Sequence, residues 1–91
     1  MGEGNCTLIY TKEGTLIDIL DLSTDAGKAA ILWSATGATN QLFAKEDVEG
    51  GVMFKAVHSE LYLTVNADGT VTQEAKDAAK NQVFTITPVA E

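Results

Sequence analysis

The residues of this chain that could carry out chemistry are few, and they do not form a catalytic set. The only histidine, His58, stands at a predicted turn with no serine, cysteine or acid–histidine pair near it in sequence, so no general base with a nucleophile is indicated. Asp18, Asp21 and Asp25 lie close together, but they lack the dense spacing of oxygen ligands found in a calcium-binding loop. We therefore expect a protein that is not an enzyme and that holds neither a metal nor a cofactor.

A second group of side chains is better suited to binding or to bracing a loop. The only tryptophan, Trp33, ends a short apolar run, and Asn40-Gln41-Leu42-Phe43 follows a small, polar, glycine-containing loop. The last four residues nearly recur as Asn81-Gln82-Val83-Phe84. An aromatic ring can fill a core corner, and a glutamine amide can tie together the backbone groups of a loop, since it offers two donors and two acceptor lone pairs. The recurrence predicts a repeated supersecondary unit.

Composition and charge restrict the class of protein. The chain has 91 residues, a net charge of −7 and 45% hydrophobic residues, which predicts one globular domain over residues 1–91. An acidic chain is a poor partner for nucleic acid or for anionic membrane surfaces, because both require clustered positive charge. No apolar run is long enough to insert into a membrane.

Cysteine usage and the N-terminus suggest a compartment. Cys6 is the only cysteine, so it is expected to be a buried or half-buried thiol, with an intermolecular disulfide as the alternative. The first residues show no cationic segment followed by a long apolar run, and thus no signal peptide. With no disulfide framework, we expect a cytoplasmic protein.

The order of apolar runs and turn signals predicts an all-β fold. Eight short strands are expected, spaced about ten residues apart, which is typical of a barrel-like or sandwich architecture. Their expected ranges are residues 6–10, 15–22, 29–33, 41–44, 52–57, 61–65, 70–73 and 82–87, the last stopped by Pro88. Residues 45–51 are expected to be an acidic, glycine-rich connection, and residues 74–80 a loop with a helical tendency.

The repeat can be aligned without a gap. Residues 19–43 placed over residues 60–84 match Leu20 with Leu61, Asn40 with Asn81 and Gln41 with Gln82. The matches fall on apolar strand positions and on the Asn-Gln-x-Phe end. This alignment predicts two four-stranded units, the first over about residues 4–44 and the second over about residues 45–88.

At these residues the chain resembles a known family. The segment LDLSTDAGKAAILWSATGATNQLF, residues 20–43, is similar to one repeat of the ricin B-type lectin domain, a β-trefoil with Gln-x-Trp repeats. The corresponding parts are Leu20-Asp21-Leu22, Gly27, Ile31-Leu32-Trp33 and Asn40-Gln41-Leu42-Phe43. The resemblance extends over about residues 8–87, and it implies a β-trefoil-like fold.

The resemblance also implies a sugar site in the first copy. In this family an Asp accepts hydrogen bonds from sugar hydroxyls, an aromatic ring stacks on the sugar, and an Asn adds polar contacts; the matching residues are Asp21, Trp33 and Asn40, with Gln41 as the supporting amide. Ile31 stands where a Gln often occurs. The residues alone leave alternatives open. Trp33 can be a core residue, Asp21 an ordinary solvated carboxylate, and Asn40 a brace for nearby backbone.

The second copy is expected to be structural, since it has Tyr62 in place of the Asp and Glu74 in place of the aromatic residue. A trefoil requires three units and the chain holds two, which would leave open sheet edges. We therefore expect self-association into a homo-oligomer, a trimer or a dimer.

The expected function is non-catalytic carbohydrate binding, for example of galactose or N-acetylgalactosamine on a glycoprotein, made multivalent by self-association. The alternatives are a protein-interaction or inhibitor module on the same scaffold, or an artificial or truncated trefoil fragment without a ligand, because a fold does not determine a function.

Overall fold

The computed structural model describes residues 6–77 and 80–87, so the predicted stop at Pro88 and part of the predicted helical loop lie outside the described residues. The fold is all-β, as predicted, with short 3₁₀ turns between strands. The strands are β1 (Cys6–Thr7), β2 (Leu16–Ile19), β3 (Ala30–Trp33), β4 (Phe43–Val48), β5 (Gly51–Ala56), β6 (Tyr62–Val65) and β7 (Val71–Glu74), and the 3₁₀ turns are η2 (Leu20–Leu22), η3 (Thr39–Gln41) and η4 (Lys80–Gln82). Within these residues no helix is long and apolar enough to cross a membrane.

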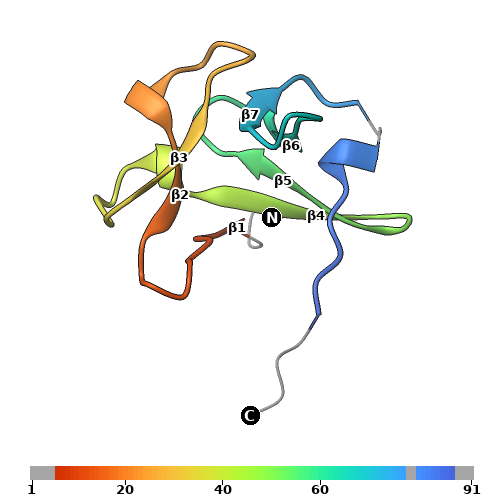
Figure 1. Ribbon diagram of the computed structural model, residues 1–91, viewed down its shortest axis with the longest axis horizontal. Coiled ribbons are helices and arrows are strands. Elements are labelled where there is room, and N and C mark those ends of the chain that lie inside the picture. The colour runs from red at the N-terminus through yellow and green to blue at the C-terminus, as the bar shows by residue number, and fades with distance from the viewer. Residues whose placement is uncertain (1–5, 78–79, 88–91) are drawn as a thin grey trace.

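The strands form one five-stranded antiparallel sheet and one separate hairpin. The sheet has the order β1-β4-β5-β6-β7, and β2 pairs with β3. The long β4–β5 hairpin crosses the middle of the molecule, with the β2–β3 hairpin on one side and the β6–β7 hairpin on the other (Figure 1). An isolated bridge between Val52 and Phe84 attaches the C-terminal segment to β5.

The prediction that residues 45–51 form a connection was wrong. Residues 43–48 are β4, and only Glu49 and Gly50 turn the chain into β5. The acidic Glu46 is accommodated in this strand because Tyr62 donates a hydrogen bond to its Oε2 over 2.7 Å and Lys76 Nζ lies 3.3 Å from its Oε1. The expected division between the units, after residue 44, therefore falls inside a strand.

Several predicted strands were too long or misplaced, and the first, expected over residues 6–10, is confined to Cys6–Thr7. The strand expected over residues 15–22 ends at Ile19, since Asp21 and Leu22 take positive φ values of 60° and 55°. Gln41, the first residue of the predicted fourth strand, instead ends η3, and β4 begins at Phe43. At the C-terminal end, Phe84 makes an isolated bridge in place of a full strand over 82–87.

The two halves repeat, but with a gap that the alignment lacked. Leu16 pairs with Trp33 in the first hairpin, and Tyr62 pairs with Glu74 in the second. The connection between the paired strands spans residues 20–29 in the first hairpin and only residues 66–70 in the second. The ungapped alignment therefore agrees with the structure after the connection, where both match Trp33 with Glu74. Before the connection the alignment is wrong, because the structure matches Asp18 with Thr64.

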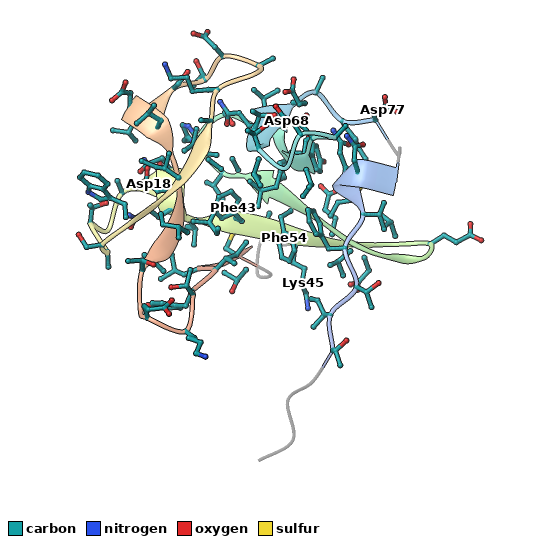
Figure 2. The ribbon with its side chains drawn as sticks, in the orientation of Figure 1. Asp18, Phe43, Lys45, Phe54, Asp68 and Asp77 are labelled. Carbon is teal, nitrogen blue, oxygen red and sulfur yellow. The ribbon has the colours of Figure 1, made fainter. Side chains whose placement is uncertain are left out.

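The core lies where the two hairpins meet the long sheet. It is built from apolar side chains of β2, β4, β5 and β6: Leu16, Ile19, Phe43, Met53, Ala56 and Leu63, all at most 5% exposed. The alternation expected for residues 61–65 is not visible in burial, because Tyr62, Leu63 and Thr64 are all buried. Both faces of β6 are therefore covered. Figure 2 shows Phe43 and Phe54 near the middle of the fold, between the two hairpins.

Candidate functional site

A buried carboxylate lies at the centre of the first hairpin. Asp18 is in β2 opposite Ile31 of β3, and it is 5% exposed. Its Oδ1 accepts a hydrogen bond from Asn40 Nδ2 over 3.1 Å, and its Oδ2 accepts one from Gln41 Nε2 over 2.9 Å. A carboxylate can accept about four hydrogen bonds. The two amides thus hold the group in place and leave acceptor capacity.

Gln41 is the brace that organises the loop before β4. Its Nε2 also donates to the Ser34 carbonyl over 2.8 Å, and its Oε1 accepts from the Thr36 backbone N–H over 2.9 Å. The predicted role of the glutamine amide, to tie together the backbone of the loop, is thereby confirmed. The side chain is 1% exposed, so a buried polar group is satisfied on both its donor and its acceptor side.

Asn40 connects this loop to the end of β2. Besides its bond to Asp18, Asn40 Nδ2 donates to the Ile19 carbonyl over 2.9 Å. The other amide atom, Oδ1, is buried and accepts no hydrogen bond from the described residues. A buried acceptor without a partner is costly. Asn40 is therefore both a brace, as one prediction had it, and a side chain with unused hydrogen-bonding capacity.

Asp18 and Asn40 border an open hollow of about 350 Å³ beside the β2–β3 hairpin. Trp33 borders it and is 55% exposed, so the alternative that Trp33 is a core residue was wrong. Asp21 borders it as well and is exposed. The hollow is lined by Asp18, Leu20, Asp21, Leu22, Ile31, Trp33, Thr36, Ala38 and Asn40. Its size is at the low end of the range for small-molecule sites.

The structure thus brings Asp21, Trp33 and Asn40 to one hollow and places Gln41 behind it, bonded to Asp18. Asp18 is the residue that sequence reasoning missed as a site residue. The signal was present, since an acidic residue in the short apolar strand Leu16–Ile19 can be buried only with hydrogen-bonding partners. Asp21 has a different setting, because it follows the strand in η2 with a positive φ of 60°.

The arrangement suits a ligand with both hydroxyl groups and an apolar face. Asp18 provides a fixed acceptor, and an exposed aromatic ring provides a flat apolar surface. Leu22 and Ile31 make the rest of the wall apolar. Within residues 6–77 and 80–87 no group of three or more histidine, cysteine or acidic side chains is placed to hold a metal ion.

The second copy keeps the brace but changes the site. Gln82 Nε2 donates to the Ala75 carbonyl over 2.9 Å, and Gln82 Oε1 accepts from the Asp77 backbone N–H over 2.8 Å. The third partner is the hydroxyl of Thr64, at 3.2 Å, in the position that Asp18 has in the first copy. Thr64 therefore replaces Asp18. Tyr62, which was expected in place of Asp21, instead corresponds to Leu16 in the paired strands. Glu74 does stand at the position of Trp33.

Tyr62 instead belongs to a polar cluster with Glu46 and the nearby Lys76 and Lys55. Burial, together with its hydrogen bond to Glu46, raises the pKa of Tyr62 to about 12. The same hydrogen bond from Tyr62, with the nearby Lys76 and Lys55, lowers the pKa of Glu46. This cluster supports β4 and contributes nothing to the hollow of the first copy.

Comparison with known proteins identifies the fold. A family model described as "Ricin-type beta-trefoil lectin domain-like" matches residues 1–74. A search of curated proteins finds no match. Among solved structures, the designed three-fold symmetric protein ThreeFoil matches with a TM-score of 0.88 and 23% identity, over 93% of this chain and 66% of that chain.

Two natural proteins are also similar in structure. The first is 1,3Gal43A, an exo-β-1,3-galactanase from Clostridium thermocellum, with a TM-score of 0.84 and 25% identity over 94% of this chain and 20% of that chain. The second is a Polyporus squamosus lectin bound to the epitope Neu5Acα2-6Galβ1-4GlcNAc, with a TM-score of 0.71 and 20% identity over 91% of this chain and 31% of that chain. The chain thus spans two thirds or less of each of these proteins.

Proposed function

Since this chain belongs to the ricin-type β-trefoil lectin-like family, we propose that it binds a carbohydrate, without catalysing a reaction, in the hollow of its first repeat. The observation that carries the proposal is the pairing of Asp18 with Asn40 and Gln41 beside the exposed ring of Trp33. A sugar has hydroxyl groups on its edges and an apolar face. The carboxylate of Asp18 can accept hydrogen bonds from the hydroxyl groups, and the ring of Trp33 can stack on the apolar face.

The proposed roles follow from the geometry. Asp18 accepts hydrogen bonds from two sugar hydroxyls, and Trp33 stacks on the apolar face of the ring. Asn40 orients Asp18, and Gln41 positions it from behind without touching the ligand. Asp21, at the mouth of the hollow, receives a further hydroxyl. Ile31 gives the hollow an apolar wall where a polar contact would otherwise be made.

Galactose or N-acetylgalactosamine is the proposed sugar. The similar galactanase acts, by its name, on a β-1,3-linked galactan. A single shallow site of this kind should bind with a Kd on the order of a millimolar, or about −4 kcal/mol. Several sites on a self-associated protein would raise the avidity for a glycoprotein without any new contact.

The test is a titration with galactose, N-acetylgalactosamine and lactose, followed by the fluorescence of Trp33, the only tryptophan. Glucose serves as the control sugar. We expect saturable changes with the galactose-type sugars, and a loss of at least ~10-fold in affinity in Asp18→Asn. Asparagine keeps the shape of the side chain but loses one of the two acceptors used by Asn40 and Gln41, so circular dichroism and thermal unfolding are measured to check that this variant remains folded.

The parallel variant Asp21→Asn separates the two aspartates. We expect a smaller loss than for Asp18→Asn, because Asp21 is exposed and is not held by the two amides. A larger loss would make Asp21 the principal acceptor. If no sugar of a broad glycan panel changes the fluorescence, the proposal is wrong, and the protein-interaction alternative gains support.

A further inference from the structure

The buried polar side chains that line the hollow of the first repeat have only acceptor capacity left. Both N–H groups of the Asn40 amide are used, one by Asp18 Oδ1 and the other by the Ile19 carbonyl, and such an amide has two. Its remaining atom, Oδ1, has no partner among the described residues, and the side chain is 6% exposed. The Asp18 carboxylate can only accept. A ligand that reaches these atoms therefore has to supply donors.

The side-chain donors of this hollow lie at its exposed rim. They are the hydroxyl of Thr36 and the indole N–H of Trp33, and both residues are exposed. Asp21, also exposed, adds a second carboxylate. No lysine or histidine is among the described residues that line the hollow.

Asp18 is a buried carboxylate without a cationic partner in the described part of the chain. Its two hydrogen bonds come from neutral amides, and the ion pairs among the described residues join Lys55 and Lys76 to Glu46. Buried charges in proteins are usually paired with an opposite charge. The hollow therefore lacks the positive charge that would balance Asp18.

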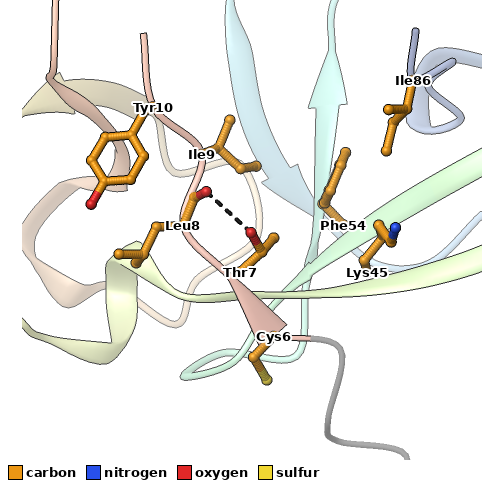
Figure 3. A pocket seen from close by; sticks show the side chains of 8 residues that line it. All are labelled: Cys6, Thr7, Leu8, Ile9, Tyr10, Lys45, Phe54 and Ile86. Carbon is orange, nitrogen blue, oxygen red and sulfur yellow. Dashed lines mark hydrogen bonds between the residues drawn. The ribbon is translucent and has the colours of Figure 1, made fainter. Parts of the chain in front are cut away.

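A larger hollow, of about 500 Å³, has a different character (Figure 3). It is bordered by residues 6–10, Phe54 and Ile86, its charged residue is Lys45, and no carboxylate is among the described residues that line it. The net charge of −7 attracts cations to the surface in general. The combination of two carboxylates with a buried, unpartnered acceptor distinguishes the hollow of the first repeat from this one.

We propose that the hollow of the first repeat prefers an amino sugar with a free, protonated amine, such as galactosamine, over the neutral sugar and over its N-acetylated form. An ammonium group has three donors and no acceptor, and it supplies the charge that Asp18 lacks. Its hydrogen bonds to a carboxylate are charge-assisted and roughly twice as strong as neutral ones. Acetylation removes the charge and two donors, and it adds a carbonyl acceptor. This inference rests on the proposed function, because it assigns a specificity to the same site.

The apolar wall of the hollow explains why the amine should be carried by a sugar. Ile31 of β3 stands directly opposite Asp18 of β2, so the two side chains lie on the same face of the hairpin. Trp33 follows two residues later on that face. A sugar ring stacked on Trp33 can therefore turn its polar edge towards Asp18. A small ammonium compound would meet the carboxylates but leave the apolar strip uncovered.

The test compares galactose, N-acetylgalactosamine, galactosamine and galacturonic acid at about pH 6, where a primary amine is protonated. Ethanolamine is the probe for an ammonium group without a sugar ring. Isothermal titration calorimetry measures each affinity. We expect galactosamine to bind at least ~10-fold more tightly than galactose, with N-acetylgalactosamine close to galactose. Galacturonic acid and ethanolamine should each bind at least ~10-fold more weakly than galactosamine.

Three aspartates provide matched variants, because each substitution removes one negative charge. Asp18→Asn should reduce the advantage of galactosamine over galactose at least ~10-fold, and Asp21→Asn ~3-fold. Asp25→Asn should leave it unchanged, because Asp25 is exposed in the same connection as Asp21 but does not line the hollow. If Asp18→Asn unfolds, as circular dichroism would show, Asp21→Asn carries the test.

The possible outcomes distinguish a failure of this inference from a failure of the proposed function. If galactose or N-acetylgalactosamine binds as tightly as galactosamine, or if Asp25→Asn removes the advantage as strongly as Asp21→Asn, the preference for an amine is wrong and carbohydrate binding stands. If ethanolamine binds as tightly as galactosamine, the hollow binds ammonium groups in general, and the inference is wrong. If none of the sugars binds, the proposed function fails, and the inference fails with it.

Discussion

Gln41 Nε2 lies 2.9 Å from Asp18 Oδ2, so an amide in the loop before β4 fixes a carboxylate in the middle of β2. The equivalent amide of the second copy, Gln82, makes its third contact with the neutral hydroxyl of Thr64. The glutamine therefore braces the loop in the same way in both units, but its third partner is a carboxylate in the first unit and a hydroxyl in the second. This difference makes the first copy a candidate binding site and the second a structural counterpart.

The two glutamines can be compared directly by replacing each with leucine. Gln41→Leu leaves the Asp18 carboxylate with one hydrogen bond fewer inside the protein, whereas Gln82→Leu leaves only a hydroxyl and backbone groups without a partner. Because hydrogen bonds to charged groups are the stronger ones, we expect a loss in the free energy of unfolding of about 3 kcal/mol for Gln41→Leu and about 2 kcal/mol for Gln82→Leu. Urea denaturation measures both.

A double variant tests the cause of this difference. Asp18→Leu combined with Gln41→Leu removes both polar partners, so its cost should be smaller than the sum of the two single costs. Strict additivity would show that the carboxylate is not what makes Gln41 important.

The Asn-Gln-x-Phe repeat could be predicted from sequence because the same residue types recur in the same order in a short stretch without a gap. Phe43 is fully buried, and Gln41 and Gln82 brace their loops as expected from the amide group. The all-β fold was predictable for the same reason: turn residues separated the short apolar runs.

The start of each unit could not be aligned from sequence, because the hairpin connections differ in length. Leu20 and Leu22 look like strand residues, yet the chain leaves β2 at Ile19 and turns through positive φ values. Because of that turn, the buried carboxylate of this region is Asp18 in β2, and Asp21 is exposed. A periodicity argument cannot detect it, since only the pairing of Asp18 with Ile31 fixes the register.

Gln73 is expected to be a second brace, between the two units. It is 0% exposed, its Nε2 donates to the carbonyls of Ser23 and Asp25 over 2.8 and 2.9 Å, and its Oε1 accepts from Ser59 Oγ over 2.7 Å. Gln73→Leu leaves all three partners without this hydrogen bond and should lower the free energy of unfolding by about 3 kcal/mol. Ser59→Ala removes one of the hydrogen bonds and should lower it by about 1 kcal/mol. Thermal unfolding of both variants checks this order, and an equal loss would contradict it.

Gly50, in the turn between β4 and β5, and Gly51, the first residue of β5, have different requirements. A Cβ on Gly51 would collide with the carbonyl oxygen of Phe84, whereas a Cβ on Gly50, where φ is 91°, would meet nothing within 4 Å. Gly50→Ala should therefore cost only about 1 kcal/mol, from the positive φ. Gly51→Ala should cost more than ~3 kcal/mol, because it breaks the contact between Val52 and Phe84 that attaches the C-terminal segment.

Chemical denaturation measures both costs, and amide hydrogen exchange at Val52 and Phe84 shows where the damage lies. Faster exchange at these two residues in Gly51→Ala, but not in Gly50→Ala, is the expected pattern. Equal destabilisation by the two substitutions would mean that the close approach to Phe84 does not limit the residue at position 51.

The Tyr62–Glu46 pair should make stability fall at alkaline pH. The pKa of Tyr62 is raised from 10.0 to about 12 in the folded protein, first by burial and then by its hydrogen bond to Glu46. A raised folded-state pKa stabilises the fold fully below the unfolded-state value and loses that contribution as the pH rises from about 10 to about 12. Tyr62→Phe removes the ionisable group, so the free energy of unfolding should decline less steeply over this interval than in the unmodified protein, the difference amounting to about 2 kcal/mol. Urea denaturation at a series of pH values measures the two slopes, and identical slopes would show that Tyr62 does not titrate differently in the folded and unfolded chain.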